Sequence, residues 1–100
     1  MVFAERLVRE YETDEQAADQ RYKGNLVEIS GFVSEIKASV SNVPDVMLQV
    51  DLPGNYFIRC IFSIEESSRL HGMRNGQYIR LRGVIAGKSD YVVISSCVLL

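Results

Sequence analysis

The stretch KGNLVEISGFVSEI, residues 23–36, decides the fold of this chain. Its apolar residues Val27, Ile29 and Val33 alternate with acidic and hydroxyl side chains, which is the period of a strand with one face in a core. Gly31 stands on the apolar face, and its missing Cβ allows a strand to coil sharply. Because the stretch is longer than the about five or six residues of a typical strand, we predict that it bends there and serves two neighbours.

The chain has 100 residues, 47% of them hydrophobic, which suits one domain with one core. No apolar run approaches the about 20 residues that cross a bilayer, and residues 1–10 are charged where a secretion signal is apolar. The chain as given therefore predicts a soluble cytoplasmic protein, or an extracytoplasmic one if a signal or lipoprotein segment has been removed. The formal net charge of -2 argues against a general attraction to phosphate.

Residues 1–22 predict a helical arm. Phe3, Leu7 and Tyr11 recur at helical spacing and form an apolar stripe that is expected to lie against the rest of the domain. Thr13 stands three residues before a glutamine, which is the pattern of a capping box and predicts the start of a second short helix. The predicted buried side of that helix consists of Ala17, Ala18 and Tyr22.

Strand patterns fill most of the remaining chain. The predicted strands are residues 46–52, 56–62, 77–86 and 91–99. Both faces of the second of these are apolar, and we assign Ile58, Cys60 and Phe62 to the inside. Ser63 precedes two glutamates and predicts the cap of a helix that ends near Leu70.

The predicted order is a helical arm, three strands, a helix and two strands. This is the order of the OB-fold, a five-stranded Greek-key barrel with a helix between its third and fourth strands. The sequence therefore predicts a mainly β fold and a single domain over residues 1–100, with the arm at 1–22 and the barrel at 23–100. A meander sheet with two helices is the alternative, and it leaves long strand edges exposed that a barrel avoids.

Short motifs along the chain also carry a family resemblance. They are Tyr11, Asp14, Ala18, Tyr22-Lys23-Gly24, Gly31-Phe32-Val33, Cys60-Ile61-Phe62, Gly76, Gly83, Gly87 and Cys97. On these residues nearly the whole chain resembles the tRNA_anti-like group of bacterial OB-fold domains. The resemblance implies the fold more than an activity, because that group is named for its similarity to anticodon-binding domains and is often attached to lipoprotein signals or membrane segments. The chain departs in having Asp14 where asparagine is expected and in showing no such signal.

OB-folds usually bind ligands on the outer face of the second and third strands, between two bordering loops. Here that face is predicted to carry Met47, Gln49, Phe57, Arg59 and Ile61. The predicted rims are Lys37, Ser39, Ser41 and Asn42 on one side and Lys88 and Ser89 on the other. Phe57 beside Arg59 is the most suggestive pair, because an aromatic ring can stack a base and an arginine can meet a phosphate. Alternatively, Phe57 and Ile61 pack under the helical arm or contact a partner protein.

Basic side chains on the fourth predicted strand offer a second candidate contact. Arg80 and Arg82 share one face and would form a phosphate track with Lys88. In the alternative interpretation, Glu28 on the neighbouring first strand pairs with one of the two arginines.

The two cysteines, Cys60 and Cys97, fall on the third and fifth strands, which are neighbours in an OB barrel. They would form a disulfide in an oxidising compartment and remain buried thiols in a reducing one. His71 is the only histidine and no Cys-x-x-Cys spacing exists, so neither a metal nor a cofactor is predicted. No nucleophile, base and orienting residue group together, so the sequence predicts no enzyme.

These patterns predict a non-catalytic OB-fold binding module. The leading hypothesis for its ligand is single-stranded nucleic acid, RNA or DNA, and this hypothesis rests on fold analogy and the modest surface around Phe57. The alternative is a structural module, envelope-associated or engaged in protein interaction or self-association. A small molecule or an oligosaccharide is a third class that the sequence leaves open.

Overall fold

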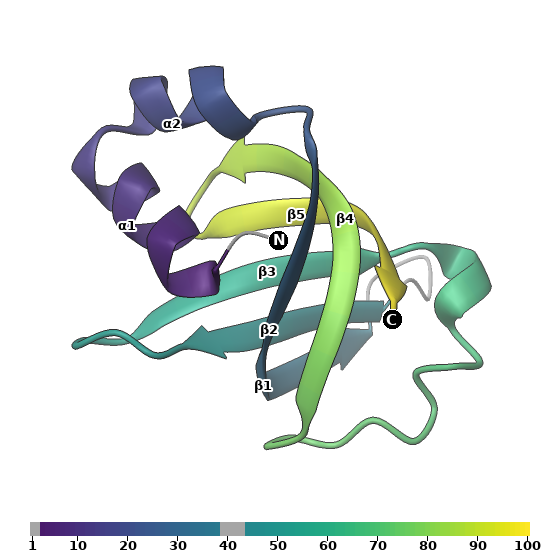
Figure 1. Cartoon of the computed structure of the whole chain (residues 1–100). Helices are drawn as coiled ribbons and strands as arrows, with labels where there is room; N and C mark the ends of the chain where they lie inside the picture. The colour runs from purple at the N-terminus through teal and green to yellow at the C-terminus, as the bar shows by residue number, and fades with distance from the viewer. Residues whose placement is uncertain (1–2, 39–43) are drawn as a thin grey trace.

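The computed structural model describes residues 3–38 and 44–100, and its strands close into a barrel in the order β1-β2-β3-β5-β4. Its helices are α1 (Ala4–Thr13) and α2 (Glu15–Tyr22), and its strands are β1 (Leu26–Ala38), β2 (Pro44–Val50), β3 (Tyr56–Phe62), β4 (Tyr78–Lys88) and β5 (Val92–Leu99). Figure 1 shows the two helices together over one end of the barrel and the segment after β3 at the other. The predicted OB-fold is therefore confirmed.

The first strand bends and pairs with two partners, as the sequence predicts. Its first half pairs with β4, ending at Phe32 opposite Tyr78, and its second half pairs with β2, beginning at Phe32 opposite Gln49. Gly31 lies at this change of partner, where an added Cβ would lie 3.4 Å from the backbone oxygen of Gln49. The absence of a Cβ lets β2 approach closely as β1 passes from one neighbour to the other.

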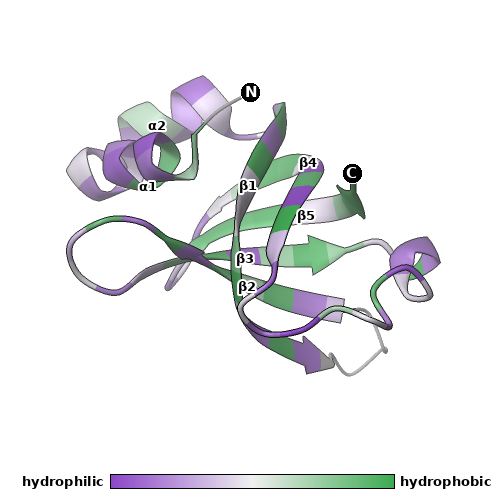
Figure 2. Cartoon of the chain, turned by 60° about the horizontal axis from the view of Figure 1, so that its bottom comes forward, coloured by the Kyte–Doolittle hydropathy of each residue, from purple (hydrophilic) through white to green (hydrophobic). Residues whose placement is uncertain are grey.

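The core lies inside the barrel and follows the alternation of the strands. Figure 2 shows hydrophobic and hydrophilic bands alternating along the strands. Ile58, Cys60 and Phe62 are at most 1% exposed, so their predicted assignment to the inside is confirmed. Gly83 of β4 faces the same interior, where an added Cβ would lie 2.6 Å from Cγ2 of Ile94. The interior is thus filled to the point where one strand position accommodates no side chain.

The helical arm closes one end of the barrel with Ala4, Leu7, Val8 and Tyr11, all of which are buried. Phe3 does not join this stripe, because it is the N-cap residue of α1 and is 70% exposed. The predicted stripe was therefore wrong at its first position. The helical turn that presents the apolar face begins only after Phe3.

The predicted capping box at Thr13 is wrong by one residue. Asp14 is the N-cap of α2, and its carboxylate accepts a hydrogen bond from the backbone N–H of Ala17 at 3.1 Å. Thr13 belongs to α1, where its hydroxyl donates to the carbonyl of Arg9 at 2.8 Å. Ala17 in the first turn is exposed, while Ala18 and Tyr22 form the buried side of α2 as predicted.

The helix predicted between Ser63 and Leu70 is reduced to a single 3-10 turn at Ile64–Glu66. The side chain of Ser63 makes no capping hydrogen bond. Glu66 is instead buried, and its Oε1 accepts the backbone N–H of Leu99 in β5 at 2.6 Å. This tertiary contact takes the carboxylate out of solvent, and the chain continues as turns that leave Leu70 buried against the core. Of the helices that the structure describes, none is long and apolar enough to cross a membrane.

Candidate functional site

The outer face of β2 and β3 carries the residues that the sequence nominated. Across the ladder, Asp45 faces Ile61, Met47 faces Arg59, and Gln49 faces Phe57. Gln49 and Arg59 are exposed, whereas Phe57 and Ile61 are half-buried. Met47 is only 8% exposed, so it lies at the base of this face, below the side chains that reach solvent. The predicted surface is therefore present with less of its area open than the alternation of residues indicated.

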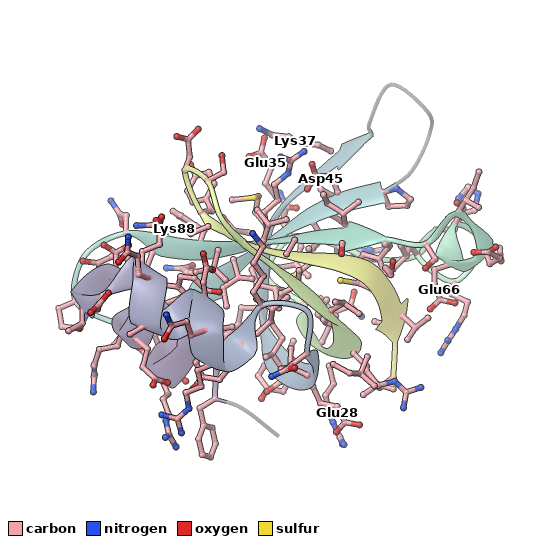
Figure 3. All side chains as sticks on the ribbon, turned by 90° about the horizontal axis from the view of Figure 1, so that it is seen from above. Glu28, Glu35, Lys37, Asp45, Glu66 and Lys88 are labelled. Atoms are coloured by element: carbon pink, nitrogen blue, oxygen red, sulfur yellow. The ribbon has the colours of Figure 1, made fainter. Side chains whose placement is uncertain are left out.

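A pocket of about 330 Å³ opens at one end of this face. It lies where the end of β1, the start of β2 and the turn between β4 and β5 converge, which is the usual ligand position of an OB-fold. Its lining residues are Glu35, Lys37, Asp45, Met47, Arg59, Ser89, Asp90, Tyr91 and Val93. Figure 3 shows Glu35, Lys37 and Asp45 close together at this end of the molecule.

Asp45 and Arg59 form the shorter of two ion pairs found among the described residues of this pocket, the other being Lys37 with Glu35. Nε of Arg59 donates to Oδ2 of Asp45 at 2.7 Å, and Nη2 lies 2.7 Å from the same oxygen. The hydrogen bond and the charge of Asp45 raise the pKa of Arg59. The side chain of Asp45 is 9% exposed and that of Arg59 is 45% exposed, so a buried carboxylate holds a guanidinium that reaches solvent.

The second carboxylate oxygen of Asp45 has no partner among residues 3–38 and 44–100. Oδ1 is buried and accepts no hydrogen bond from any residue that the structure describes. A buried acceptor without a donor costs about 1–3 kcal/mol, so a ligand that brought a donor would satisfy it. The sequence analysis missed Asp45, although its charge lies one ladder step from that of Arg59 on the same face.

Aromatic side chains form a row across the outside of the barrel. Tyr78, Phe32, Gln49 and Phe57 are successive partners across β4, β1, β2 and β3, and Tyr91 lies beside Phe57. The rings of Phe32 and Tyr78 meet edge to face at 5.1 Å, and those of Phe57 and Tyr91 meet at 6.2 Å. Phe32 and Tyr78 are more than half exposed, and Tyr91 is 41% exposed. We call Tyr78, Phe32, Phe57 and Tyr91 the aromatic row.

Phe57 is the one member of this row among the ligand-binding residues that the sequence predicts. The signal for Phe32 was its place in the first strand, where a large aromatic side chain stands on the polar phase between Gly31 and Val33. A single exposed aromatic residue is common, so this position becomes a signal for a contact surface only together with other exposed aromatic side chains beside it. That Tyr78 lies beside Phe32 could be known only from the register between β1 and β4, which the sequence does not give.

The family described as tRNA_anti-like matches residues 1–98 of this chain. The chain belongs to the tRNA_anti-like family. Among solved structures, it is similar to the crystal structure of a "putative nucleic acid-binding lipoprotein" from Klebsiella pneumoniae subsp. pneumoniae MGH 78578. That comparison has a TM-score of 0.75 at 12% sequence identity and covers 100% of this chain and 92% of the other, which shows a shared fold. No curated protein sequence matches the chain.

This tRNA_anti-like domain brings only part of the predicted site together. Lys37 lines the pocket with its Nζ 3.9 Å from Oε2 of Glu35. Lys88 lies apart, over the helical arm, where its Nζ is 3.1 Å from Oε1 of Glu12 (Figure 3). Of the other rim residues, Ser89 lines the pocket, whereas Ser39, Ser41 and Asn42 lie outside the described residues.

The arginines of β4 lie on the opposite side of β1 from the pocket. Arg82 faces Glu28 across the ladder, while the ion pair joins Nη2 of Arg80 to Oε2 of Glu28 at 3.7 Å. The alternative in which Glu28 pairs with one of the two arginines is therefore the one observed. A phosphate track that joins Arg82 to Lys88 remains a prediction.

The two cysteines of the tRNA_anti-like domain are buried free thiols on neighbouring strands. Burial raises the pKa of the Cys60 thiol, and the neighbouring Cys97 thiol raises it further. A disulfide between them remains a prediction for an oxidising compartment. Within residues 3–38 and 44–100, no cluster of His, Cys, Asp or Glu is placed to hold a metal ion.

Proposed function

We propose that this tRNA_anti-like domain is a non-catalytic module that binds single-stranded nucleic acid, RNA or DNA, on the outer face of β2 and β3 and the adjoining loops. The observation that carries the proposal is the aromatic row, in which Phe57 lies on that face, Phe32 and Tyr78 lie beside it on β1 and β4, and Tyr91 lies in the turn before β5. Stacking on an aromatic side chain contributes about 1–3 kcal/mol per base. Because every base has an apolar face, such a row binds a single strand with little dependence on its sequence.

The spacing of the row suits successive bases. In the register of the barrel, Gln49 stands between two edge-to-face pairs, Phe32 with Tyr78 and Phe57 with Tyr91. Neighbouring strands lie about 4.8 Å apart. An edge-to-face pair leaves part of at least one ring face open to a third aromatic group. A single strand laid across the barrel would therefore meet two stacking positions with a polar amide between them.

Charge and similarity support the same class of ligand. The side chains of Arg59 and Lys37 are 45% and 60% exposed beside the row, and their exposed parts would contact phosphates that pass outside the pocket without making the whole domain basic. The Klebsiella structure carries a name that includes nucleic acid binding. The same name includes the word lipoprotein, which supports an extracytoplasmic location as the alternative to a cytoplasmic one.

The test is fluorescence anisotropy of labelled single-stranded DNA and RNA titrated with the protein at low and at near-physiological salt. We expect saturable binding that weakens as salt rises. Phe32→Leu and Phe57→Ala are expected to weaken it about tenfold each, because each removes one stacking face. Phe32→Leu keeps an apolar side chain, so its effect separates stacking from general hydrophobicity.

The matched control is Ile64→Ala, which shortens another exposed apolar side chain on the 3-10 turn at Ile64–Glu66, away from the row. It is expected to bind as the wild type does. Absence of binding at low salt would rule out the proposed function. Equal affinities for the wild type and Phe32→Leu would move the site away from the row.

A further inference from the structure

The pocket beside the aromatic row ends on one specific polar atom. Oδ2 of Asp45 is occupied by Arg59 at 2.7 Å, and Oδ1 is buried without a donor among the described residues. Tyr91 belongs both to the row and to the pocket lining. If one base of a single strand stacks on Tyr91, the next base along that strand would therefore reach the mouth of the pocket.

The charges of the pocket disfavour a phosphate inside it. Three carboxylates line it, those of Glu35, Asp45 and Asp90, against the two cations Lys37 and Arg59. A phosphate that entered would face the unpaired oxygen of Asp45 and two further acids, which repel it. The ligand group that enters should therefore be a hydrogen-bond donor.

The guanidinium of Arg59 also disfavours a cation at the same place. It lies against the carboxylate whose free oxygen needs the donor, so an ammonium group would approach a positive charge as it approached Oδ1. Arg59 has five N–H donors in a planar fork, and its contacts with Asp45 leave others to offer. A neutral group with a donor next to an acceptor complements both residues.

The walls of the pocket favour a flat, partly apolar group. Met47 and Val93 supply apolar surface from two strands, and Tyr91 supplies an aromatic ring. The edge of a nucleobase combines such a flat ring with neighbouring donors and acceptors. This matches the chemistry that Asp45 and Arg59 require.

Resting on the proposed function, we infer that this pocket takes the edge of a nucleobase that carries an exocyclic amino group. The amino N–H donates to Oδ1 of Asp45, and the acceptor next to it on the base accepts an N–H from Arg59. Cytosine and adenine present this pair of groups. Uracil lacks the amino group, and its N–H stands between two carbonyl oxygens that would face the carboxylates of the pocket.

The test compares labelled oligodeoxycytidine with oligodeoxyuridine of equal length, because the two differ at the edge that the pocket reads. By fluorescence anisotropy, the wild type is expected to bind the cytosine strand about tenfold more tightly, the effect of one hydrogen bond to a charged group. Asp45→Asn exchanges an acceptor for an amide that offers N–H groups, and it should bring the two affinities close to parity. Its affinity for the cytosine strand should fall toward that for the uracil strand, and far-ultraviolet circular dichroism reports separately that the variant is folded.

Glu65→Gln is the matched control, since it removes an exposed carboxylate that does not line this pocket. It should keep the preference for cytosine. Equal binding of both strands by the wild type would overturn the inference and leave the proposed function standing, and this comparison needs no variant. A preference that survived Asp45→Asn would also overturn it. Absence of binding to either strand would overturn both proposals.

Discussion

Glu66 reaches across one end of the barrel and accepts the backbone N–H of Leu99, with 2.6 Å between Oε1 and the nitrogen. The same oxygen lies 3.2 Å from Nη1 of Arg69. A carboxylate that is 7% exposed thus ties the segment after β3 to the last strand. At this end of the domain, the hydrogen bond between Glu66 and Leu99 helps to hold the barrel closed. The sequence predicted a helix here, between Ser63 and Leu70.

Glu66→Ala is expected to lower the free energy of unfolding by about 1–3 kcal/mol, because it leaves the N–H of Leu99 without its partner. Urea unfolding followed by circular dichroism measures this loss. Glu65→Ala is the matched control, since the neighbouring glutamate is exposed, and it should change stability by less than about 0.5 kcal/mol. Equal effects of the two substitutions would contradict the role of Glu66.

Gly83→Ala is expected to destabilise the domain by about 1–3 kcal/mol through overpacking. The added Cβ would lie 2.6 Å from Cγ2 of Ile94 and 2.9 Å from the backbone oxygen of Ser95, so the backbone of β5 would have to shift as well as a side chain. Gly72→Ala provides the control, because its added Cβ meets nothing within 4 Å among the described residues. Thermal unfolding should show a lower melting temperature for Gly83→Ala alone, and an unchanged value would show that the barrel relaxes at this point.

We expect the domain to lose stability at alkaline pH because of Tyr11. Burial raises its pKa, and the hydrogen bond from its hydroxyl to Oδ1 of Asp19 at 2.8 Å raises it further. Above about pH 10, the ordinary pKa of tyrosine, the folded state holds a proton that the unfolded state has released. Stability is therefore complete below that pH and falls as the pH rises above it.

Tyr11→Phe should remove part of this alkaline loss at a cost of about 1 kcal/mol near neutral pH, where one hydrogen bond disappears. Tyr22 and Cys60, whose pKa values are also raised, maintain a smaller slope of the same sign. The measurement is the free energy of unfolding in urea at neutral pH and at several values above about pH 10. An identical alkaline slope for the variant and the wild type would show that Tyr11 does not carry the effect.

Much of the fold could be predicted from local sequence patterns, because each of these patterns depends only on residues that are close together in the chain. The alternation around Gly31 predicted a bent strand with two partners, and the alternation in β3 placed Ile58, Cys60 and Phe62 inside. The helix predicted after Ser63 failed because its competitor was not local. The hydrogen bond from Leu99 to Glu66 joins residues that are distant along the chain, and no window around Ser63 contains it.

The sequence by itself determined the barrel and the faces of its strands, because alternation and turn chemistry select the buried side of each strand whatever its partner is. Only the tertiary structure decided the candidate site. Register places Phe32 beside Tyr78, and packing buries Asp45 next to Arg59, where its second oxygen has no donor among the described residues. Both features depend on distances between strands, which are decided when the barrel closes and its side chains pack together.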